Sequence, residues 1–345
     1  MAALAVAIGI EAQTVWHSAD TLLLYGKVND STETRYERLP ASLKGQVRDQ
    51  QWYLGKNTAG LAIRFATNSP VVKARWKALN NFAMDHMTNR GIKGVDLYCL
   101  GEDGWRFVGS GAPNRDGNGD KTLVQNMVPT WREFMLYLPL YDGVTSLEIG
   151  VDSCSLLSNP RYESPIRNTP IVYYGTSITQ GGCASRPGMA HTNILSRQLD
   201  RETINLGFSG QGKLDIEIAQ LMAQADASAF IIDCMPNCDT EIVRERFVPF
   251  YRTLREAHPD TPIIVIENPL FSYMNFDQEK YASITALNTE LRRQYAAVAD
   301  ANSMLLSPGV GSGSDWEGTV DCVHFTDLGF LRYSQWLLPY LQDLE

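Results

Sequence analysis

The second half of the chain alternates short apolar runs with longer segments of helical spacing, and this alternation constrains the fold most. Apolar runs rich in β-branched and aromatic residues indicate strands at residues 171–174, 203–206, 229–233, 262–266 and 304–306. Helical spacing follows at residues 189–200, 215–224, 240–257, 279–299 and 327–344. Because each connection has room for one helix, we expect parallel strands with helices on both faces. The pattern predicts a three-layer α/β sandwich of flavodoxin-like strand order 2-1-3-4-5.

Residues 15–157 show a different pattern, in which short runs of period two are separated by polar turns. The clearest candidate strands are residues 61–66, 71–79, 94–99, 105–108, 132–138 and 146–151. Glu102-Asp103-Gly104 is predicted to close one hairpin, and residues 141–144 another. Many short strands without a long helix predict an all-β sandwich or jelly roll. Its aromatic residues are expected to fill the core rather than to form a sugar platform: Trp52, Tyr53, Trp76, Trp105 and Trp131.

A polar stretch at residues 158–170 separates the two patterns. It carries three prolines and has no periodicity, so it is predicted to be a linker. The 345-residue chain is then divided into a β domain at residues 15–157 and an α/β domain at residues 171–345. This agrees with a length about twice that of a typical domain.

Composition excludes several classes of function. A formal net charge of -9 makes a nucleic-acid partner improbable, and no run reaches the roughly 18 apolar residues of a membrane span. Six cysteines are too few for a disulfide scaffold, and we interpret most of them as small buried side chains. The acidic loop at residues 114–120 lacks a full calcium-ligand pattern. Oligomeric state is left open.

The N-terminal run at residues 2–10 is short and apolar, and Glu11-Ala12-Gln13 follows it where a leader could end. A positive segment does not precede the run, so it is either the remnant of a leader or the first strand. We expect export to the periplasm or the medium, with a cytoplasmic location left open.

Four of the five loops that follow predicted strands offer a group suited to acyl transfer. Ser177 follows the first strand, Gly210 lies in a Gly-rich turn after the second, and Asn237 follows the third. Asp321 and His324 precede the last helix. Because the carboxyl ends of parallel strands meet at one edge of the sheet, we expect these groups to lie together.

The chemistry assigns a role to each group. Ser177 is the candidate nucleophile, His324 the general base and acid, and Asp321 the carboxylate that orients His324. The N–H groups of Ser177 and Gly210 and the amide of Asn237 would form an oxyanion hole. Taken singly, Ser177 and Asp321 could be helix caps and His324 a satisfied histidine, but their order together favours catalysis.

Four other histidines need no catalytic role. His17 and His86 fall in the β half, and His258 lies at a predicted helix C-terminus, where a cation is favoured. His191, near the start of the helix after Ser177, is the one competitor to His324.

These residues resemble the SGNH hydrolases, the GDSL-like esterase superfamily. Gly175-Thr176-Ser177-Ile178 is similar to the first block of that family, residues 205–210 to the second, Pro236-Asn237 to the third, and Asp321-Cys322-Val323-His324 to the fourth. Gly94-Val95-Asp96-Leu97-Tyr98 resembles the Gly-x-Asp-Leu-Tyr stretch of a subgroup with a β-sandwich before the hydrolase domain. Thr176 stands where the family usually has Asp, and Asn237 lacks the usual Gly-x-Asn-Asp setting, which leaves loop geometry and substrate in question.

The resemblance implies ester hydrolysis, often of acetyl groups on sugars, without a metal or organic cofactor. We therefore expect a serine esterase that removes short acyl groups from a small-molecule or oligosaccharide ester. Two alternatives are a lipid or lysophospholipid esterase, and a carbohydrate-binding protein with an inactive hydrolase domain.

Overall fold

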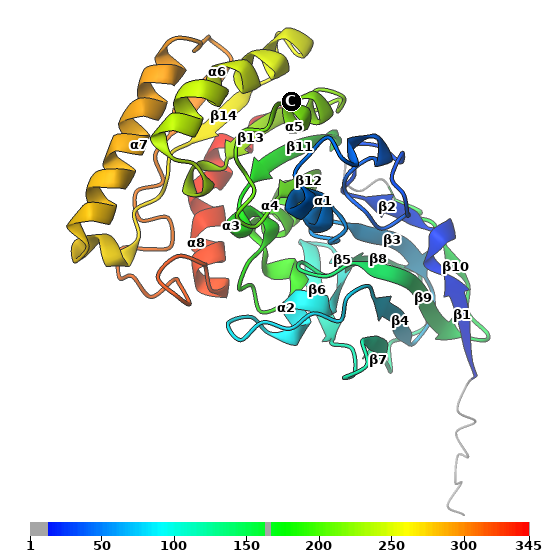
Figure 1. Ribbon diagram of the computed structural model, residues 1–345. Helices are drawn as coiled ribbons and strands as arrows, with labels where there is room; N and C mark the ends of the chain where they lie inside the picture. The colour runs from blue at the N-terminus through cyan, green and yellow to red at the C-terminus, as the bar shows by residue number, and fades with distance from the viewer. Residues whose placement is uncertain (1–12, 163–166, 345) are drawn as a thin grey trace, which may run out of the picture.

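A five-stranded parallel sheet forms the centre of the second half (Figure 1). The computed structural model describes residues 13–162 and 167–344. Strand order across the sheet is β12 (Arg201–Gly207), β11 (Arg167–Gly175), β13 (Ala229–Asp233), β14 (Ile263–Ile266) and β15 (Ser303–Leu306). All four pairings are parallel. The predicted order 2-1-3-4-5 is confirmed.

Helices cover both faces of this sheet because the side chains of a strand alternate in direction. Val172 and Tyr174 of β11 pack with α5 (Ile216–Met222), α6 (Thr240–Ala257) and α7 (Gln278–Ala296). Ile171 and Tyr173 pack instead with α3 (Ser177–Gln180), α4 (His191–Leu199) and α8 (Asp327–Leu337). In Figure 1, α6 and α7 lie side by side on the outer left. The three-layer prediction is confirmed.

Two antiparallel sheets form the first half, as the period-two pattern predicted. One has the order β1-β9-β4-β7; the other has the order β10-β3-β8-β5-β6, with β2 also paired to β3. Their bounds are β1 (Thr14–Ser18), β2 (Leu23–Tyr25), β3 (Ala62–Thr67), β4 (Val72–Ala78), β5 (Val95–Gly101), β6 (Gly104–Gly111), β7 (Asn118–Val124), β8 (Arg132–Tyr137), β9 (Val144–Asp152) and β10 (Leu157–Ser158). The jelly-roll topology and the domain division stay predictions; β11 already begins at Arg167, inside the predicted linker, whose residues 163–166 lie outside the described residues.

The predicted hairpin at residues 141–144 is wrong, because β8 and β9 belong to different sheets. The turn is drawn inward by Asp142, whose carboxylate is fully buried. It accepts hydrogen bonds from the backbone N–H groups of Asn80 at 2.9 Å, Phe82 at 3.0 Å and Gly143 at 2.8 Å. These bonds tie the crossing between the sheets to the segment that follows β4.

The central strands of the six-stranded sheet, β3 and β8, are buried on both faces. One face packs on the other sheet through residues such as Ile63, Leu97 and Leu136. The opposite face carries Tyr98 and Tyr137, which contact the second half of the chain. The guanidinium of Arg197 in α4 lies 4.0 Å from the Tyr98 ring centroid. Every residue of β3 is consequently buried. In a sheet with one face exposed to solvent, buried and exposed residues would alternate along the strand.

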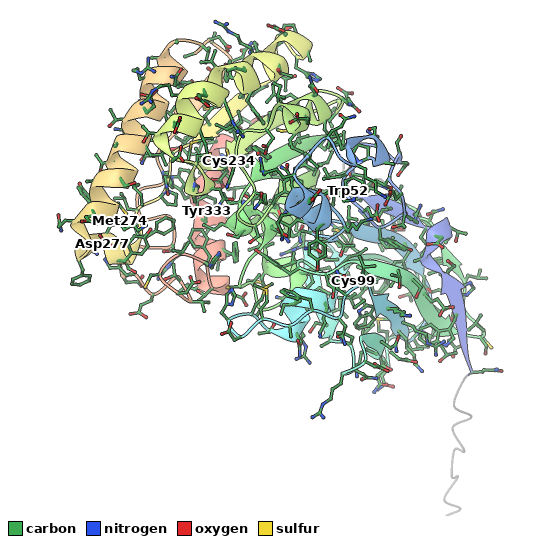
Figure 2. All side chains as sticks on the ribbon, in the orientation of Figure 1. Trp52, Cys99, Cys234, Met274, Asp277 and Tyr333 are labelled. Atoms are coloured by element: carbon green, nitrogen blue, oxygen red, sulfur yellow. The ribbon has the colours of Figure 1, made fainter. Side chains whose placement is uncertain are left out.

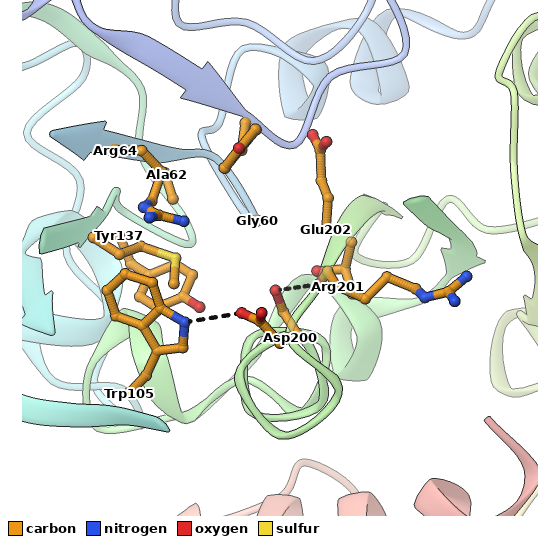
Figure 3. Close-up of a pocket in the computed structure, with 12 residues that line it drawn as sticks. Gly60, Ala62, Arg64, Trp105, Tyr137, Asp200, Arg201 and Glu202 are labelled. Atoms are coloured by element: carbon orange, nitrogen blue, oxygen red, sulfur yellow. Dashed lines mark hydrogen bonds between the residues drawn. The ribbon is translucent and has the colours of Figure 1, made fainter. Parts of the chain in front are cut away.

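A small cavity lies where this sheet meets β12 (Figure 3). Trp105 stacks under the guanidinium of Arg64, 4.4 Å from the ring centroid, and donates to Asp200 Oδ1 at 3.4 Å. Burial raises the pKa of Glu202 to about 7. The volume of about 20 Å³ admits about one water molecule, so this cavity is too small for an ester substrate.

The predicted burial of the aromatic side chains and of the cysteines is only partly confirmed. Trp76 is buried between the sheets, whereas Tyr53 is 40% exposed. Trp52, on α1 (Asp49–Gly55), packs against the core of the second half (Figure 2). Two of the six cysteines are buried, Cys183 and Cys234. No helix in the described part of the chain is long and apolar enough to cross a membrane.

The segment before α1 is joined to the second half by a fully buried arginine, Arg38. Its guanidinium donates to the carbonyls of Leu54 at 2.7 Å and Asn57 at 2.8 Å. Across the interface it also donates to the carbonyls of Asn205 at 2.9 Å and Gly207 at 2.8 Å. Burial lowers the pKa of Arg38, and the four carbonyl dipoles are what compensate the buried charge.

We expect Arg38→Lys to lower the free energy of unfolding by about 3 kcal/mol. A lysine ammonium cannot replace a planar fork that reaches four carbonyls, and each carbonyl left unpaired costs about 1–3 kcal/mol. Urea unfolding followed by tryptophan fluorescence measures the change. Arg252→Lys, on the exposed surface of α6, is the control and should stay within about 0.5 kcal/mol of the wild type. Equal stability of the two variants would contradict this role for Arg38.

Candidate active site

The loops that carry the predicted site residues lie at the carboxyl end of the parallel sheet. Ser177 is the first residue of α3, directly after β11, and Gly210 follows β12. Asn237 ends the short helix η4 (Met235–Asn237) after β13. Asp321 and His324 precede α8.

Ser177, His324 and Asp321 form a continuous chain of hydrogen bonds. Ser177 Oγ lies 2.9 Å from His324 Nε2, and His324 Nδ1 lies 2.7 Å from Asp321 Oδ2. Asp321 Oδ1 accepts the backbone N–H of His324 at 2.8 Å, which fixes the carboxylate against the ring. Burial of the Asp321 carboxyl favours a higher pKa, but hydrogen bonds from His324 hold the pKa below its usual value. The arrangement can move a proton from a serine hydroxyl to an imidazole that an ionised carboxylate orients.

The turn that presents Ser177 is held from both sides. Thr176 caps α3, because its hydroxyl accepts the N–H of Ile178 at 3.2 Å. The carbonyl of Ser177 accepts the N–H of Gly182 at 2.7 Å and the hydroxyl of Tyr141 at 3.1 Å. Thr176 thus supplies a cap where the related family usually has Asp, and Tyr141 comes from the first half of the chain.

The segment that leads to Gly210 lies closely against α3, and Asn237 is bonded to the same loop. A Cβ at Gly207 would collide with the backbone nitrogen of Gln180. Only glycine at this position therefore lets the end of β12 lie so close to α3. Gly210 has a φ of 68°, in the left-handed region. Asn237 Oδ1 accepts the N–H of Gly212 at 3.2 Å, which leaves Nδ2 as the donor end of the amide.

The Gly-x-Asp-Leu-Tyr stretch holds the loop that follows Ser177, the candidate nucleophile. Asp96, fully buried on β5, accepts Arg186 Nη1 at 2.8 Å and the N–H of Gly188 at 2.9 Å. The hydroxyl of Tyr98 accepts the same Arg186 nitrogen at 2.6 Å. Burial raises the pKa of Asp96, with Arg186 opposing the rise. The sequence pattern therefore marks a contact between the two halves.

Within the part of the chain that the structure describes, no other histidine takes part in the hydrogen bonds that join Ser177, His324 and Asp321. His191 is buried beside Tyr173 and Tyr333, and burial lowers its pKa to about 3, so it stays neutral. His258 follows α6, as expected, and its Nε2 lies 2.9 Å from the Ala223 carbonyl oxygen. His86 lies beside His324, with 5.9 Å between the two ring centroids.

Sequence reasoning missed the residues of the first half that reach this site. Arg48 donates to Gln211 Oε1 and to the Gln211 carbonyl, both at 2.8 Å, and pairs with Asp215. It thereby braces the loop of Gly210. Tyr141 and His86 also come from the first half. No spacing in the sequence relates Arg48, Tyr141 and His86 to the four loops of the site, because only tertiary packing brings these residues close to the loops.

A buried carboxyl lies at the end of β13, in the strand that leads to Asn237. The Asp233 carboxylate accepts a hydrogen bond at 2.9 Å from the hydroxyl of Tyr333 in α8; Figure 2 labels Tyr333. Burial raises the pKa of Asp233 to about 7, with the Tyr333 hydrogen bond opposing the rise. Burial also raises the pKa of the Cys183 thiol to about 12, so that this thiol is neutral.

Comparisons with known proteins agree with this architecture. The model of the GDSL-like lipase/acylhydrolase family matches residues 168–342, and a model described as the N-terminus of SGNH-hydrolase-type esterases matches residues 14–157. A solved structure from Bacteroides ovatus, named as a GDSL-like lipase, is 38% identical with a TM-score of 0.90, over 96% of this chain and 98% of that one. No curated protein matches the chain in sequence.

Two more distant structures share the fold over nearly the whole of both chains. A salicylyl-acyltransferase from a tetracycline biosynthetic pathway is 15% identical, with a TM-score of 0.77, over 97% of this chain and 99% of that one. A family two carbohydrate esterase from Cellvibrio japonicus is 13% identical, with a TM-score of 0.62, over 96% and 98%.

We expect Asp233→Asn to stabilise the protein more at pH 7.5 than at pH 4.5. A carboxyl whose folded pKa is raised from 3.8 to about 7 binds more protons folded than unfolded, so its contribution to stability falls as the pH rises between these values. From pH 4.5 to pH 7.5, the free energy of unfolding of the variant should therefore rise by about 2–3 kcal/mol relative to that of the wild type. Urea unfolding at each pH measures this gain. Asp343→Asn, which changes an exposed carboxyl, is the control and should follow the wild type. If the free energy of unfolding depends on pH equally in the wild type and both variants, the raised pKa of Asp233 is contradicted.

Proposed function

Because the chain belongs to the GDSL-like lipase/acylhydrolase family and is a carboxylic ester hydrolase, we propose that it removes short acyl groups, in the first place acetyl, from a carbohydrate. The reaction proceeds through an acyl-enzyme on Ser177. His324 is the general base and acid, and Asp321 orients it.

In the first step, Ser177 Oγ attacks the ester carbonyl carbon while His324 Nε2 takes the hydroxyl proton. The imidazolium then gives this proton to the alcohol oxygen as the carbon–oxygen bond to the sugar breaks. Water repeats the sequence on the acyl-enzyme and releases the carboxylic acid. The ionised Asp321 carboxylate favours the imidazolium in both halves of the reaction.

The negative oxygen of each tetrahedral intermediate needs donors that are already in place. We assign this role to the N–H groups of Ser177 and Gly210 and to Nδ2 of Asn237. Gln180 supports the arrangement of the second loop, because its Oε1 accepts the N–H of Ser209 at 3.0 Å.

The observation that carries the proposal is the two-bond chain from Ser177 through His324 to Asp321, at 2.9 and 2.7 Å. The same side-chain types in isolation would be compatible with structural roles. Their bonding in this order, at the sheet edge where α/β proteins bind ligands, supports acyl transfer.

A carbohydrate substrate is supported by the fold shared with carbohydrate esterases, one of them solved in complex with cellohexaose. An open hollow of about 720 Å³ also reaches Cys322, the residue after Asp321. It is lined by Tyr273 and by Phe276, which is 88% exposed. Exposed rings of this kind can stack on the face of a sugar, and they could also hold a longer acyl chain, which keeps a lipid esterase as the second candidate.

We expect wild-type protein to hydrolyse p-nitrophenyl acetate, and Ser177→Ala and His324→Ala to lower kcat by about 10³-fold or more. Absorbance of p-nitrophenolate measures the rate, and Ser303→Ala, far along the chain on β15, is the matched serine control. Full activity of either site variant would refute the assignment. Acetylated oligosaccharides and p-nitrophenyl octanoate then separate the two candidates: faster turnover of octanoate would favour the lipid esterase.

We expect Asn237→Asp to lower kcat about 100-fold with little change in KM. The aspartate can still accept the Gly212 N–H through Oδ1, but it places a negative oxygen where Asn237 has its donor. Steady-state kinetics on p-nitrophenyl acetate separate kcat from KM. Asn114→Asp changes an exposed amide in the same way and should leave kcat unchanged. Rates for Asn237→Asp within about threefold of wild type would remove Asn237 from the oxyanion hole.

A further inference from the structure

Two side chains that ester hydrolysis does not use lie beside His324. Within residues 13–162 and 167–344, His86, Cys183 and His324 are the one group of three His, Cys, Asp or Glu residues whose ligand atoms all lie within 4.8 Å of one another. His86 comes from the segment after β4, Cys183 from the loop after α3 and His324 from the segment before α8. Three separate parts of the chain thus converge on one point.

In both histidines the same ring nitrogen, Nδ1, is hydrogen-bonded to a carboxylate. Nδ1 of His324 lies 2.7 Å from Asp321 Oδ2, and Nδ1 of His86 lies 3.1 Å from Asp85 Oδ1. A carboxylate on one ring nitrogen holds the other ring nitrogen unprotonated and available, which is the arrangement of histidines that bind metals. Nε2 of each ring is therefore the candidate ligand atom.

The position of His86 follows from contacts that join its segment to the Cys183 loop. Thr88 Oγ1 donates to the Ser185 carbonyl at 2.5 Å. A Cβ at Gly91 would collide with the carbonyl of Ala184, so α2 (Asn89–Lys93) lies directly on this loop. Cys183 itself is buried and has a φ of 72°, a conformation that places the thiol at the cost of backbone strain.

The donor set selects the kind of ion. Two imidazole nitrogens and one thiolate sulfur suit Zn²⁺ and are poor ligands for Mg²⁺ or Ca²⁺. Tetrahedral Zn²⁺, with bonds of about 2.0–2.3 Å, holds its ligand atoms about 3.3–3.8 Å apart. Small side-chain movements would therefore bring the three ligand atoms, now within 4.8 Å of one another, to these distances. The side chains of His86 and His324 are 34% and 24% exposed, which leaves a path for the ion.

We propose that His86, Cys183 and His324 bind Zn²⁺ and that bound Zn²⁺ inhibits the enzyme. The ion forms bonds to both Nε2 atoms and to Cys183 Sγ, and the thiol proton passes to solvent. A water molecule completes the tetrahedron. His324 Nε2 then has no lone pair left to accept the Ser177 proton, and hydrolysis stops until the ion leaves. The inhibition depends on the proposed function, whereas the metal site does not.

Cobalt binding tests the site without reference to activity. Co²⁺ added to the apo protein, prepared with EDTA, should give visible d–d absorption of tetrahedral strength and a near-ultraviolet thiolate-to-cobalt band. The stoichiometry should be one ion per chain. Cys183→Ser should lack the thiolate band, and Cys322→Ser, which removes an exposed thiol nearby, should keep it. Absence of the band from the wild type, or its loss in Cys322→Ser instead, would overturn the metal site.

Zinc titration of the esterase activity tests the inhibition. We expect Zn²⁺ to abolish hydrolysis of p-nitrophenyl acetate and EDTA to restore it. His86→Asn should keep the basal rate and raise the half-inhibiting Zn²⁺ concentration about tenfold or more, because one ligand is lost. His17→Asn, a histidine on β1, should change neither value. Equal zinc sensitivity of His86→Asn and wild type, or activation by Zn²⁺, would overturn the inhibitory role.

If the wild type shows no esterase activity, the proposed function fails and the cobalt spectrum still decides the metal site. If activity is normal and no cobalt band forms, the metal site alone fails. The variant His86→Asn also avoids the strained position of Cys183, so a folding defect in Cys183→Ser does not remove the test.

Discussion

The geometry of the candidate active site depends on the hydrogen bonds of the buried Arg38 guanidinium. This guanidinium joins two carbonyls of its own half of the chain to the carbonyls of Asn205 and Gly207 at the end of β12. A charge buried this way is tolerated only while all four bonds are made. The loop of Gly210 can therefore not shift independently of the first half, and Arg48 extends the same restraint to Gln211.

The antiparallel sheets support the loops that carry the candidate site residues. Tyr141 holds the carbonyl of Ser177, and Asp96 and Tyr98 hold Arg186 in the loop beyond it. The central strands of the six-stranded sheet are buried on both faces, so Asp96 and Tyr98 are enclosed between the two halves of the chain. We infer that the first half contributes to preorganisation of the site, which is where enzymes of this kind obtain much of their rate.

Periodic signals were sufficient for most of the fold. The strands and helices from residue 171 onward alternate in a pattern that has one economical parallel arrangement, and its strand order is confirmed. Prediction failed where burial or topology overrides local signals. The turn at residues 141–144 has a hairpin composition, yet the buried Asp142 carries the chain to the other sheet. The polar edge strand β7 also has too weak a pattern to be recognised.

By itself, the sequence determined the strand order and the order of the candidate site residues Ser177, Gly210, Asn237, Asp321 and His324, because period and loop position are local properties of the chain. Only the tertiary structure decided which side chains from the first half reach them. Arg38, Tyr141 and His86 all come from the first half of the chain, whereas the loops that carry the candidate site residues come from the second. Their partners are set by how two cores pack, and no local pattern encodes that packing.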